Sequence, residues 1–503
     1  MDQAIKNMMD LYGVTPATKR FLESEQRMVV NGEFVAARDN ETIDVIEPST
    51  ASYLTSVPSG TTTDIDDAVA AARAALREGP WATMKPAERE RMLFRLADAI
   101  EHHAQTLGEI ETIDNGKAIG PCIEMDILGG AELLRYMAGF VTKLDGATRQ
   151  VSIPGDHLAW TIREPVGVVG AIVPWNWPFN MAMWKMAAAL AVGCTMVIKP
   201  AQQTSLSMLY FAKLCEEVGL PPGVINIVTG RGSTIGDYLA NHPAIDKVSF
   251  TGSTPVGKTV GEAAGRALSP VTLELGGKSP MIAFDDADPK AVAAATRWSV
   301  YFNTGQVCSA GSRLYAHSAV YDDVIEELAK VTGAMKIAPG LDPDCDMGPV
   351  ISDSALRGIK GYIEQGKTEG AELIFGGNEL DRPGYFIEPT LFAASNNKLS
   401  IVQEEIFGPV LVVLKFDSDE EALRLANDNI YGLAGSIWTQ DISRALRYSA
   451  ELEAGTVWIN NHDIVDSNMP CGGFKQSGFG KDMGPEQLNY FTRTKAVWAT
   501  LQR

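Results

Sequence analysis

The stretch VGVVGAIV at residues 166–173 decides how this sequence folds. It contains only apolar residues and glycine, and such an uninterrupted run is typical of a β-strand that is buried on both faces. After it, segments with strand and helix patterns alternate along the chain. Strands are expected at residues 195–199, 224–228, 247–250 and 271–274, and helices at residues 181–192, 205–218, 234–240 and 255–264. This succession predicts a parallel sheet with helices on both faces, which binds ligands beyond the carboxyl ends of its strands.

A second α/β succession follows between residues 280 and 475. Helices are expected near residues 289–301, 321–336, 353–369 and 419–427, and strands near residues 314–316, 371–375, 410–416, 435–438 and 455–459. Because a chain of 503 residues is too long for one hydrophobic core, we expect separate domains with a cleft between them.

The flanking segments carry shorter elements. An Asn31-Gly32 turn between two β patterns predicts a hairpin at residues 29–35. A helix over the first 25 residues, a strand at 43–48, and helices at 63–77, 86–103 and 107–116, the first capped by Thr63 or Asp64, are also expected. The stretches at 149–164 and 490–501 alternate like edge strands, so we expect them to pair with each other or with the sheet of a neighbouring chain.

Composition excludes several classes of function. A net charge of −20 argues against nucleic acid as a partner, because phosphate binding needs a basic surface. The cysteines are widely spread without a CxxC pair, which argues against disulfides and metal sites and favours a reducing cytoplasm: Cys122, Cys194, Cys215, Cys308, Cys345 and Cys471. We expect neither a secretion signal nor a membrane span, since Lys185 and Gly193 interrupt the most apolar run.

The candidate nucleophile is Cys308, in the stretch FNTGQVCSAGSR at residues 302–313. Glycine and serine surround it, so the stretch is a poor core strand and a plausible loop. Such a loop exposes a thiol close to backbone N–H groups, a setting that favours the thiolate. The alternative is that Cys308 is a buried cysteine acting as a small apolar side chain.

Two further residues are placed at strand ends. Asn176 follows the strand at 166–173 in the stiff segment PWNWPF, where its amide could donate to an oxyanion, or could instead cap the next helix. Glu274 ends the strand at 271–274, where burial would raise its pKa toward that of a general base. The alternatives for Glu274 are an ion pair with Lys278 or a surface position.

Seven motifs in order make this sequence resemble the aldehyde dehydrogenase superfamily from about residue 26 to the C-terminus. They are PWNWP at 174–178, KPA at 199–201, FTGST at 250–254, LELGGK at 273–278, GQVC at 305–308, EEIFGPV at 404–410 and GGFKQSG at 472–478. The resemblance implies an α/β fold with three parts. They are a Rossmann-like NAD(P)-binding domain (1–145 and 166–276), an α/β catalytic domain that carries the thiol (277–480) and a small β oligomerisation element (146–165 and 481–503).

The same resemblance implies oxidation of an aldehyde to a carboxylic acid with NAD(P)+. Cys308 resembles the nucleophile that forms a thiohemiacetal, and the Asn176 amide and the Cys308 backbone N–H resemble the oxyanion donors. Glu274 resembles the base that activates the water that hydrolyses the thioester. Because relatives that transfer the acyl group to coenzyme A generally lack this carboxylate, we expect water as the acceptor.

The cofactor site is implied by resemblance rather than by a glycine motif, since no GxGxxG follows the first buried strand. Gly252 and Ser253, before the helix at 255, are expected to meet the pyrophosphate. The other implied contacts are Ile172, Trp175, Lys199, Gln202, Gly232, Glu405 and Phe407. Gln202 stands where NAD-preferring relatives commonly carry glutamate. A neutral amide does not repel a 2′-phosphate, so NAD is the expected cofactor, with NADP also accepted.

The implied aldehyde pocket consists of Trp177, Met181, Trp184, Val307, Ser309 and Val465. This aromatic and apolar set has no basic residue and favours an uncharged aryl aldehyde. Segments 163–169 and 461–470 most resemble bacterial members that act on phenylacetaldehyde, which suggests a role in aromatic catabolism.

Alternatives remain open at this point. Asp463 and Asp466 could attract an aminoaldehyde or betaine aldehyde, and an aliphatic aldehyde is a further candidate. A cysteine hydrolase or esterase is the alternative from another class, but none of the histidines lies in a cysteine-protease signature. The family resemblance also implies a homo-oligomer, a tetramer or a dimer.

Overall fold

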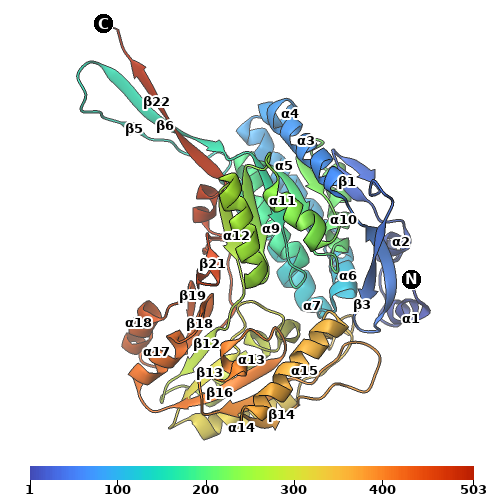
Figure 1. Cartoon of the computed structure of the whole chain (residues 1–503), viewed down its shortest axis with the longest axis vertical. Coiled ribbons are helices and arrows are strands. Elements are labelled where there is room, and N and C mark those ends of the chain that lie inside the picture. The colour runs from blue at the N-terminus through green and yellow to red at the C-terminus, as the bar shows by residue number, and fades with distance from the viewer. Residues whose placement is uncertain (503) are drawn as a thin grey trace.

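The computed structural model describes residues 1–502 and contains two helix-covered sheets and a projecting arm (Figure 1). The first sheet has eight strands in the order β2-β1-β9-β8-β7-β10-β11-β21. Their bounds are β2 Glu33–Val35, β1 Met28–Val30, β9 Ile225–Ile227, β8 Thr195–Lys199, β7 Val168–Ile172, β10 Lys247–Thr251, β11 Val271–Glu274 and β21 Gly478–Phe479. Strands β9, β8, β7, β10 and β11 run parallel, and every residue of β7 is buried. The prediction from residues 166–173 is confirmed.

Helices cover both faces of this sheet because β7 sends alternate side chains to opposite sides. Val169 and Ala171 join the core beneath α5 (Pro86–His102), α6 (Ala104–Asn115), α8 (Gly129–Ala138), α9 (Pro178–Val192) and α10 (Leu206–Glu217). Val168 and Ile172 join the core beneath α3 (Thr62–Arg77), α11 (Asp237–Asn241) and α12 (Thr254–Ala267). A fully buried strand between two helical layers needs apolar residues at every position.

Two details differ from expectation. Thr61, not Thr63 or Asp64, is the N-cap of α3, and Asp64 completes a capping box with it. Helix α8 and the π-helix η1 (Cys122–Leu128) before it are absent from the sequence prediction. Gly129 and Gly130 argue against a helix by propensity, but a Cβ atom on Gly130 would lie 2.8 Å from Met183, so the glycine allows α8 and α9 to approach closely.

The second sheet has seven strands in the order β14-β15-β16-β13-β12-β18-β19. Their bounds are β14 Glu372–Phe375, β15 Thr390–Ala394, β16 Val410–Phe416, β13 Arg313–His317, β12 Pro280–Ala283, β18 Ala434–Trp438 and β19 Thr456–Ile459. Only the edge strand β14 pairs antiparallel. The helices of this part are α13 Pro289–Ser299, α14 Tyr321–Gly333, α15 Asp353–Thr368, α17 Asp419–Asn427 and α18 Ile442–Glu451. β12, β15 and α18 were not predicted. The two strands are short and mostly buried, so they leave a weak periodic signal, whereas α18 is an amphipathic helix that the sequence analysis missed.

The arm is a three-stranded sheet that extends away from the body and carries the C-terminus near its tip (Figure 1). β22 (Thr492–Thr500) pairs antiparallel with all of β6 (His157–Pro165), and β5 (Thr148–Arg149) lies beyond β6. The predicted pairing of these two stretches is confirmed within one chain. Leu158, Ile162 and Trp498 are exposed on the arm.

The remaining elements are short. They are α1 Gln3–Leu11, α2 Pro16–Glu23, β3 Thr42–Glu47, β4 Ser52–Pro58, α4 Pro80–Thr83, α7 Ile119–Pro121, η2 Gly232–Gly236, η3 Phe302–Gly305, α16 Ser400–Gln403, β17 Tyr431–Gly432, β20 Phe474–Lys475 and η4 Pro485–Asn489. No helix within residues 1–502 is long and apolar enough to cross a membrane.

Candidate active site

The loop before Cys308 has an unusual backbone. Asn303, Thr304 and Gly305 have φ angles of 47°, 57° and 71°, and this left-handed region is costly for a β-branched residue such as Thr304. Side-chain bonds stabilise it: Thr304 Oγ1 donates to Gly348 O at 2.9 Å, and Asn303 Nδ2 donates to Asn176 O at 3.0 Å. The loop is therefore held in one shape by the rest of the fold.

Asn176 is joined to this loop by a second bond. It is 5% exposed, and its Nδ2 donates to Gln306 O at 2.9 Å. The side chain of Gln306 is itself held, because Nε2 donates to Asn303 O and Oε1 accepts from Ile351 N, both at 2.9 Å. Helix α9 begins at Pro178 with Trp177 as its N-cap, so the capping alternative for Asn176 is wrong. An amide nitrogen carries two hydrogens, and the second can serve an oxyanion.

Glu274 ends β11 and is 7% exposed, so a surface position is excluded. The described residues show no ion pair between Glu274 and Lys278, and Lys278 Nζ and Glu274 Oε1 are both buried without a hydrogen-bond partner. Burial, and then the charge of Asp482, raises the pKa of Glu274 well above its usual range. A carboxyl group in this state suits a general base that receives a proton from water.

The thiol of Cys308 is less acidic in the structure than the sequence analysis expected. The residue is partly exposed, but desolvation and then the charges of Glu405, Asp463 and Glu274 raise its pKa to about 12. The backbone N–H of Ser309 acts in the opposite direction. The expectation that this loop favours the thiolate is wrong for the protein alone, because burial and, after it, the carboxylates outweigh the amide. A base must therefore take the thiol proton before or during attack.

Glycines allow the reactive groups to meet. A Cβ atom on Gly276 would lie 2.1 Å from Glu405 Oε2, one on Gly277 2.3 Å from Cys308 O, and one on Gly472 2.6 Å from Glu274 Oε1. Side chains at these positions would displace all three groups. The glycines of the LELGGK and GGFKQSG motifs thus allow Glu405, Cys308 and Glu274 to approach one another closely. Cys471, before Gly472, was not predicted as part of the site, yet burial and then the charges of Glu274 and Cys308 raise its thiol pKa.

The residues expected at the pyrophosphate and ribose fit an anionic nucleotide. Gly252 and Ser253 precede the 14-residue helix α12, and the Ser253 side chain leaves the first N–H groups of that helix uncapped. Lys199 ends β8, is 3% exposed and donates to Pro200 O at 2.8 Å, and burial lowers its pKa to about 8. Gln202 is half-buried and Gly232 is exposed at the start of η2.

The residues expected at the nicotinamide end lie beside the catalytic groups. The rings of Trp175 and Phe407 meet edge to face at 5.3 Å, and Phe407 has a φ of 56°. Glu405 Oε1 accepts from Gly277 N at 2.9 Å, and burial raises the Glu405 pKa to about 7. Ile172 is buried at the end of β7. The donor set fits a dinucleotide lying across the carboxyl ends of the parallel strands.

The residues expected in the aldehyde pocket divide into groups. Trp177 and Val307 form an apolar cluster with Phe302, Ala310 and Met125, and the Trp177 and Phe302 rings are 5.5 Å apart. Met181 and Trp184 pack instead into the core of the helical layer. The sequence analysis quoted Phe302 and Ala310 in the stretch around Cys308 but did not assign them to the pocket, and it missed Met125 altogether.

The remaining two pocket residues differ in exposure. Ser309 Oγ donates to Asp463 Oδ1 at 2.6 Å, and Asp463 Oδ2 is buried without a partner in the described chain. Val465 is 49% exposed. Asp463 thus lies next to the nucleophile, whereas Val465 is on the surface of the loop that follows.

Comparison with known proteins agrees with this geometry. Residues 34–497 match the aldehyde dehydrogenase family. A phenylacetaldehyde dehydrogenase of Pseudomonas fluorescens is 46% identical over 482 residues, which are 95% of this chain and 96% of that protein. An NAD+ complex of an aldehyde dehydrogenase from Bacillus cereus superposes with a TM-score of 0.95 at 45% identity, covering 97% of this chain and 99% of the other.

A third similar protein is a variant of an indole-3-acetaldehyde dehydrogenase of P. syringae in complex with NAD+ and IAA. It has a TM-score of 0.93 at 40% identity and covers 96% of this chain and 98% of its own.

Proposed function

This chain belongs to the aldehyde dehydrogenase family, and we propose that its preferred substrate is phenylacetaldehyde or a similar aryl aldehyde. It oxidises aldehydes to carboxylic acids. The observation that supports an aryl substrate is the apolar cluster of Trp177, Phe302 and Val307 that adjoins Cys308. Two aromatic rings beside the nucleophile offer edge and face contacts to a planar ring. Relatives named for phenylacetaldehyde and indole-3-acetaldehyde point the same way.

The cationic alternative has weaker support. Asp463 receives a hydrogen bond from Ser309, which occupies one of its two carboxylate oxygens. Asp466 is exposed. An aminoaldehyde or betaine aldehyde would therefore compete with Ser309 for one oxygen of Asp463, while an aliphatic aldehyde would leave the aromatic wall partly unused.

We assign the chemistry to three side chains. Once a base has taken the thiol proton, the sulfur of Cys308 attacks the aldehyde carbon, and the second N–H of Asn176 donates to the oxygen as negative charge develops on it. Glu274, buried within electrostatic reach of the thiol, removes the proton from the water that hydrolyses the thioester on Cys308. When bound, the nicotinamide cofactor supplies the hydride acceptor.

The cofactor is NAD+, as in the complex of the Bacillus cereus relative. We infer that NADP+ is also accepted, because the half-buried Gln202 presents a neutral amide near Lys199. Steady-state kinetics with both cofactors test this inference. Gln202→Glu should lower kcat/KM for NADP+ about tenfold and leave NAD+ within about twofold, since a carboxylate repels the 2′-phosphate. Equal losses with both cofactors would contradict it.

We also propose the division into NAD(P)-binding, catalytic and oligomerisation parts given by the motifs. The exposed apolar side chains of the arm support a homo-oligomer, and the tetramer is favoured over the dimer. Because Cys308 must stay a free thiol, a reducing cytoplasm suits the protein.

The test of substrate is NADH formation with a panel of aldehydes. Phenylacetaldehyde should give a kcat/KM at least about tenfold above those of hexanal and betaine aldehyde, since an aryl ring buries more apolar surface against the cluster. A higher value for betaine aldehyde would overturn the proposal.

A further inference from the structure

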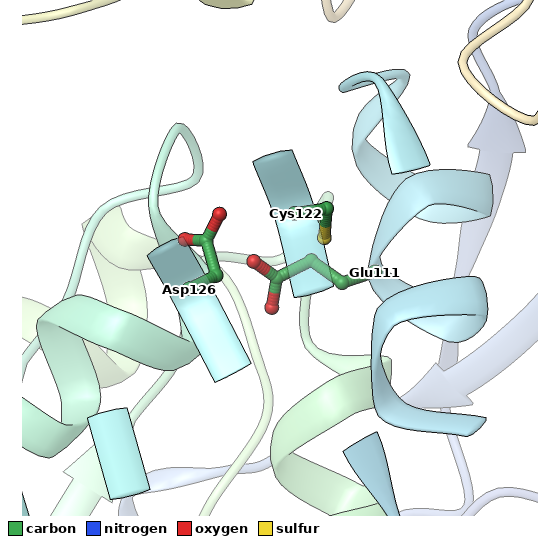
Figure 2. A group of neighbouring side chains, drawn as sticks. All are labelled: Glu111, Cys122 and Asp126. Carbon is green, nitrogen blue, oxygen red and sulfur yellow. The ribbon is translucent and has the colours of Figure 1, made fainter. Parts of the chain in front are cut away.

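A second group of buried ionisable side chains lies in the helical layer over the first sheet. Glu111 is on α6, Lys117 follows that helix, and Cys122 and Asp126 are on η1. Glu111, Cys122 and Asp126 are 0% exposed and Lys117 is 1% exposed. In Figure 2 the carboxyl group of Glu111 lies between the Asp126 carboxyl group and the Cys122 thiol, and ligand atoms of the three are within 4.8 Å of one another.

Two carboxyl oxygen atoms of this group lack a hydrogen-bond partner among the described residues. Lys117 Nζ donates to Asp126 Oδ2 at 2.5 Å, and Glu111 Oε2 accepts from Ser207 Oγ at 2.8 Å. Glu111 Oε1 and Asp126 Oδ1 are buried without partners among the described residues. One proton shared by these two oxygens would satisfy both and leave two carboxyl groups with one negative charge, which Lys117 neutralises.

A shared proton fits this group better than a metal ion does. Burial and the charge of Asp126 raise the pKa of Glu111 well above its usual range, so Glu111 holds its proton readily. Burial also raises the pKa of Cys122, which keeps the thiol neutral and a weak ligand. A cation would lie beside the ammonium of Lys117, which already occupies Asp126. The group is therefore closed and nearly neutral without an ion.

Lys117 connects this group to the aldehyde pocket. Its Nζ lies 4.1 Å from the centroid of the Trp177 ring, within the range of a cation–π contact. The same ring packs against Phe302 in the cluster beside Cys308. Because both Lys117 and its partner Asp126 are buried, the ammonium cannot swing into solvent, and its position determines the position of the ring.

The neighbours of Lys117 bind the same loop on both sides of Trp177. Asn115 Nδ2 donates to Trp175 O at 2.7 Å, and the backbone N–H of Phe179 donates to Glu111 Oε2 at 3.1 Å. Residues 111–117 thus contact the segment 175–179 at three places, which are Trp175, Trp177 and Phe179. Asn176, the oxyanion donor, lies inside the span that is held.

We propose that Lys117 is a positioning residue for the aldehyde pocket: its ammonium group holds the Trp177 ring as the wall against which an aryl substrate binds. The shared proton of Glu111 and Asp126 keeps that ammonium in place without surplus charge. This assignment rests on the proposed function, since it gives the ring a substrate to bind.

The test uses variants that remove the ammonium without leaving a lone buried charge. Lys117→Met with Asp126→Asn replaces both members of the ion pair by uncharged side chains of similar size. In the full-length enzyme with NAD+, KM for phenylacetaldehyde should rise roughly tenfold while KM for acetaldehyde changes less than about twofold. The kcat values should stay within about threefold. A merely structural role would lower both activities together.

A double-mutant cycle shows whether Lys117 acts through the ring. In a Trp177→Leu background the same pair of substitutions should change KM for either aldehyde less than about twofold, because the ring is already gone. Lys143→Met is the matched control, since Lys143 lies over the partly buried Phe140 ring at 5.9 Å and should leave both KM values unchanged.

Each outcome decides something. An unchanged KM for phenylacetaldehyde, equal losses with both aldehydes, or the same loss in the Trp177→Leu background would overturn the assignment to Lys117. Should wild type prefer another aldehyde of the panel, the aryl proposal fails by itself, and the cycle is then read with that preferred substrate. A metal ion present at one equivalent in purified wild type and lost in the Asp126→Asn variant would overturn the shared proton.

Discussion

The protein contains two buried groups with nearly the same composition and different consequences. The first has Cys308, Glu274, Lys185 and Asp482, and the second has Cys122, Glu111, Lys117 and Asp126. In both, burial raises the pKa of the glutamate and of the thiol. Cys308 is a partly exposed residue, whereas Cys122 is 0% exposed.

The comparison teaches that a raised pKa does not by itself identify an active site. The first group has Asn176 beside it and an apolar cluster facing the thiol. The group that contains Lys117 is buried in the helical layer, and its proposed role is to position the Trp177 ring beside Cys308. Access for a substrate and an oxyanion donor separate catalysis from structure.

The largest expected difference comes from removing each thiol. Cys308→Ala should lower aldehyde oxidation by more than about a thousandfold, since no nucleophile remains. Cys122→Ala should keep kcat within about twofold and lower the free energy of unfolding by about 1 kcal/mol through the cavity it leaves. NADH formation and thermal unfolding measure the two effects. Similar activity losses in both variants would break the comparison.

Substitution of Glu274 and of Glu111 should give the second largest difference, in kcat. Glu274→Gln should lower kcat by roughly a hundredfold or more while the thiohemiacetal step persists, because the base for hydrolysis is lost. In wild type, kcat should rise with pH, since only ionised Glu274 accepts a proton and its pKa is raised.

Glu111→Gln should retain kcat within about threefold, as the amide can donate to Asp126 in place of the shared proton. Single-turnover and steady-state NADH measurements across pH distinguish these outcomes. A kcat that is independent of pH would argue against Glu274 as the base.

Two of the buried asparagines, Asn176 and Asn115, offer a finer separation. Asn176→Ala should lower kcat about a hundredfold by removing an oxyanion donor. Asn115→Ala removes only the bond to Trp175 O, and should cost less than about tenfold in kcat/KM. If Asn115→Ala proved as harmful as Asn176→Ala, the role of Asn176 would be one of loop support rather than charge stabilisation.

The smallest effect concerns stability against pH. A carboxyl group whose folded-state pKa is raised above its unfolded value loses stabilising effect as pH rises from the unfolded value of 4.5 toward the folded one. Glu111, which faces Lys117, Asp114, Cys122 and Asp126, is such a group. The unfolding temperature of Glu111→Gln minus that of wild type should therefore be larger at pH 8 than at pH 5.5. A difference that is constant across this range would show that Glu111 does not hold a proton.

Local pattern identified much of the fold and part of the site. The apolar run at 166–173 predicted the central strand because a strand between two helical layers must be apolar throughout. Glu274 was found because a carboxylate at the end of a buried strand is costly and calls for a function, and Asn176 because the stiff PWNWPF segment after a central strand would fix its amide. Phe302, Met125 and Lys117 could not be found in this way, since their importance depends on neighbours that are distant in sequence.

The sequence by itself determined the order of strands and helices, the family and the candidate nucleophile. Those properties depend on periodicity and on short motifs, which are local. The tertiary structure decided that the Cys308 thiol has a raised pKa, and that Lys117 lies under the wall of the pocket. Both follow from charges and rings brought together from separate elements, because electrostatic interaction and burial depend on distance in space rather than on separation along the chain.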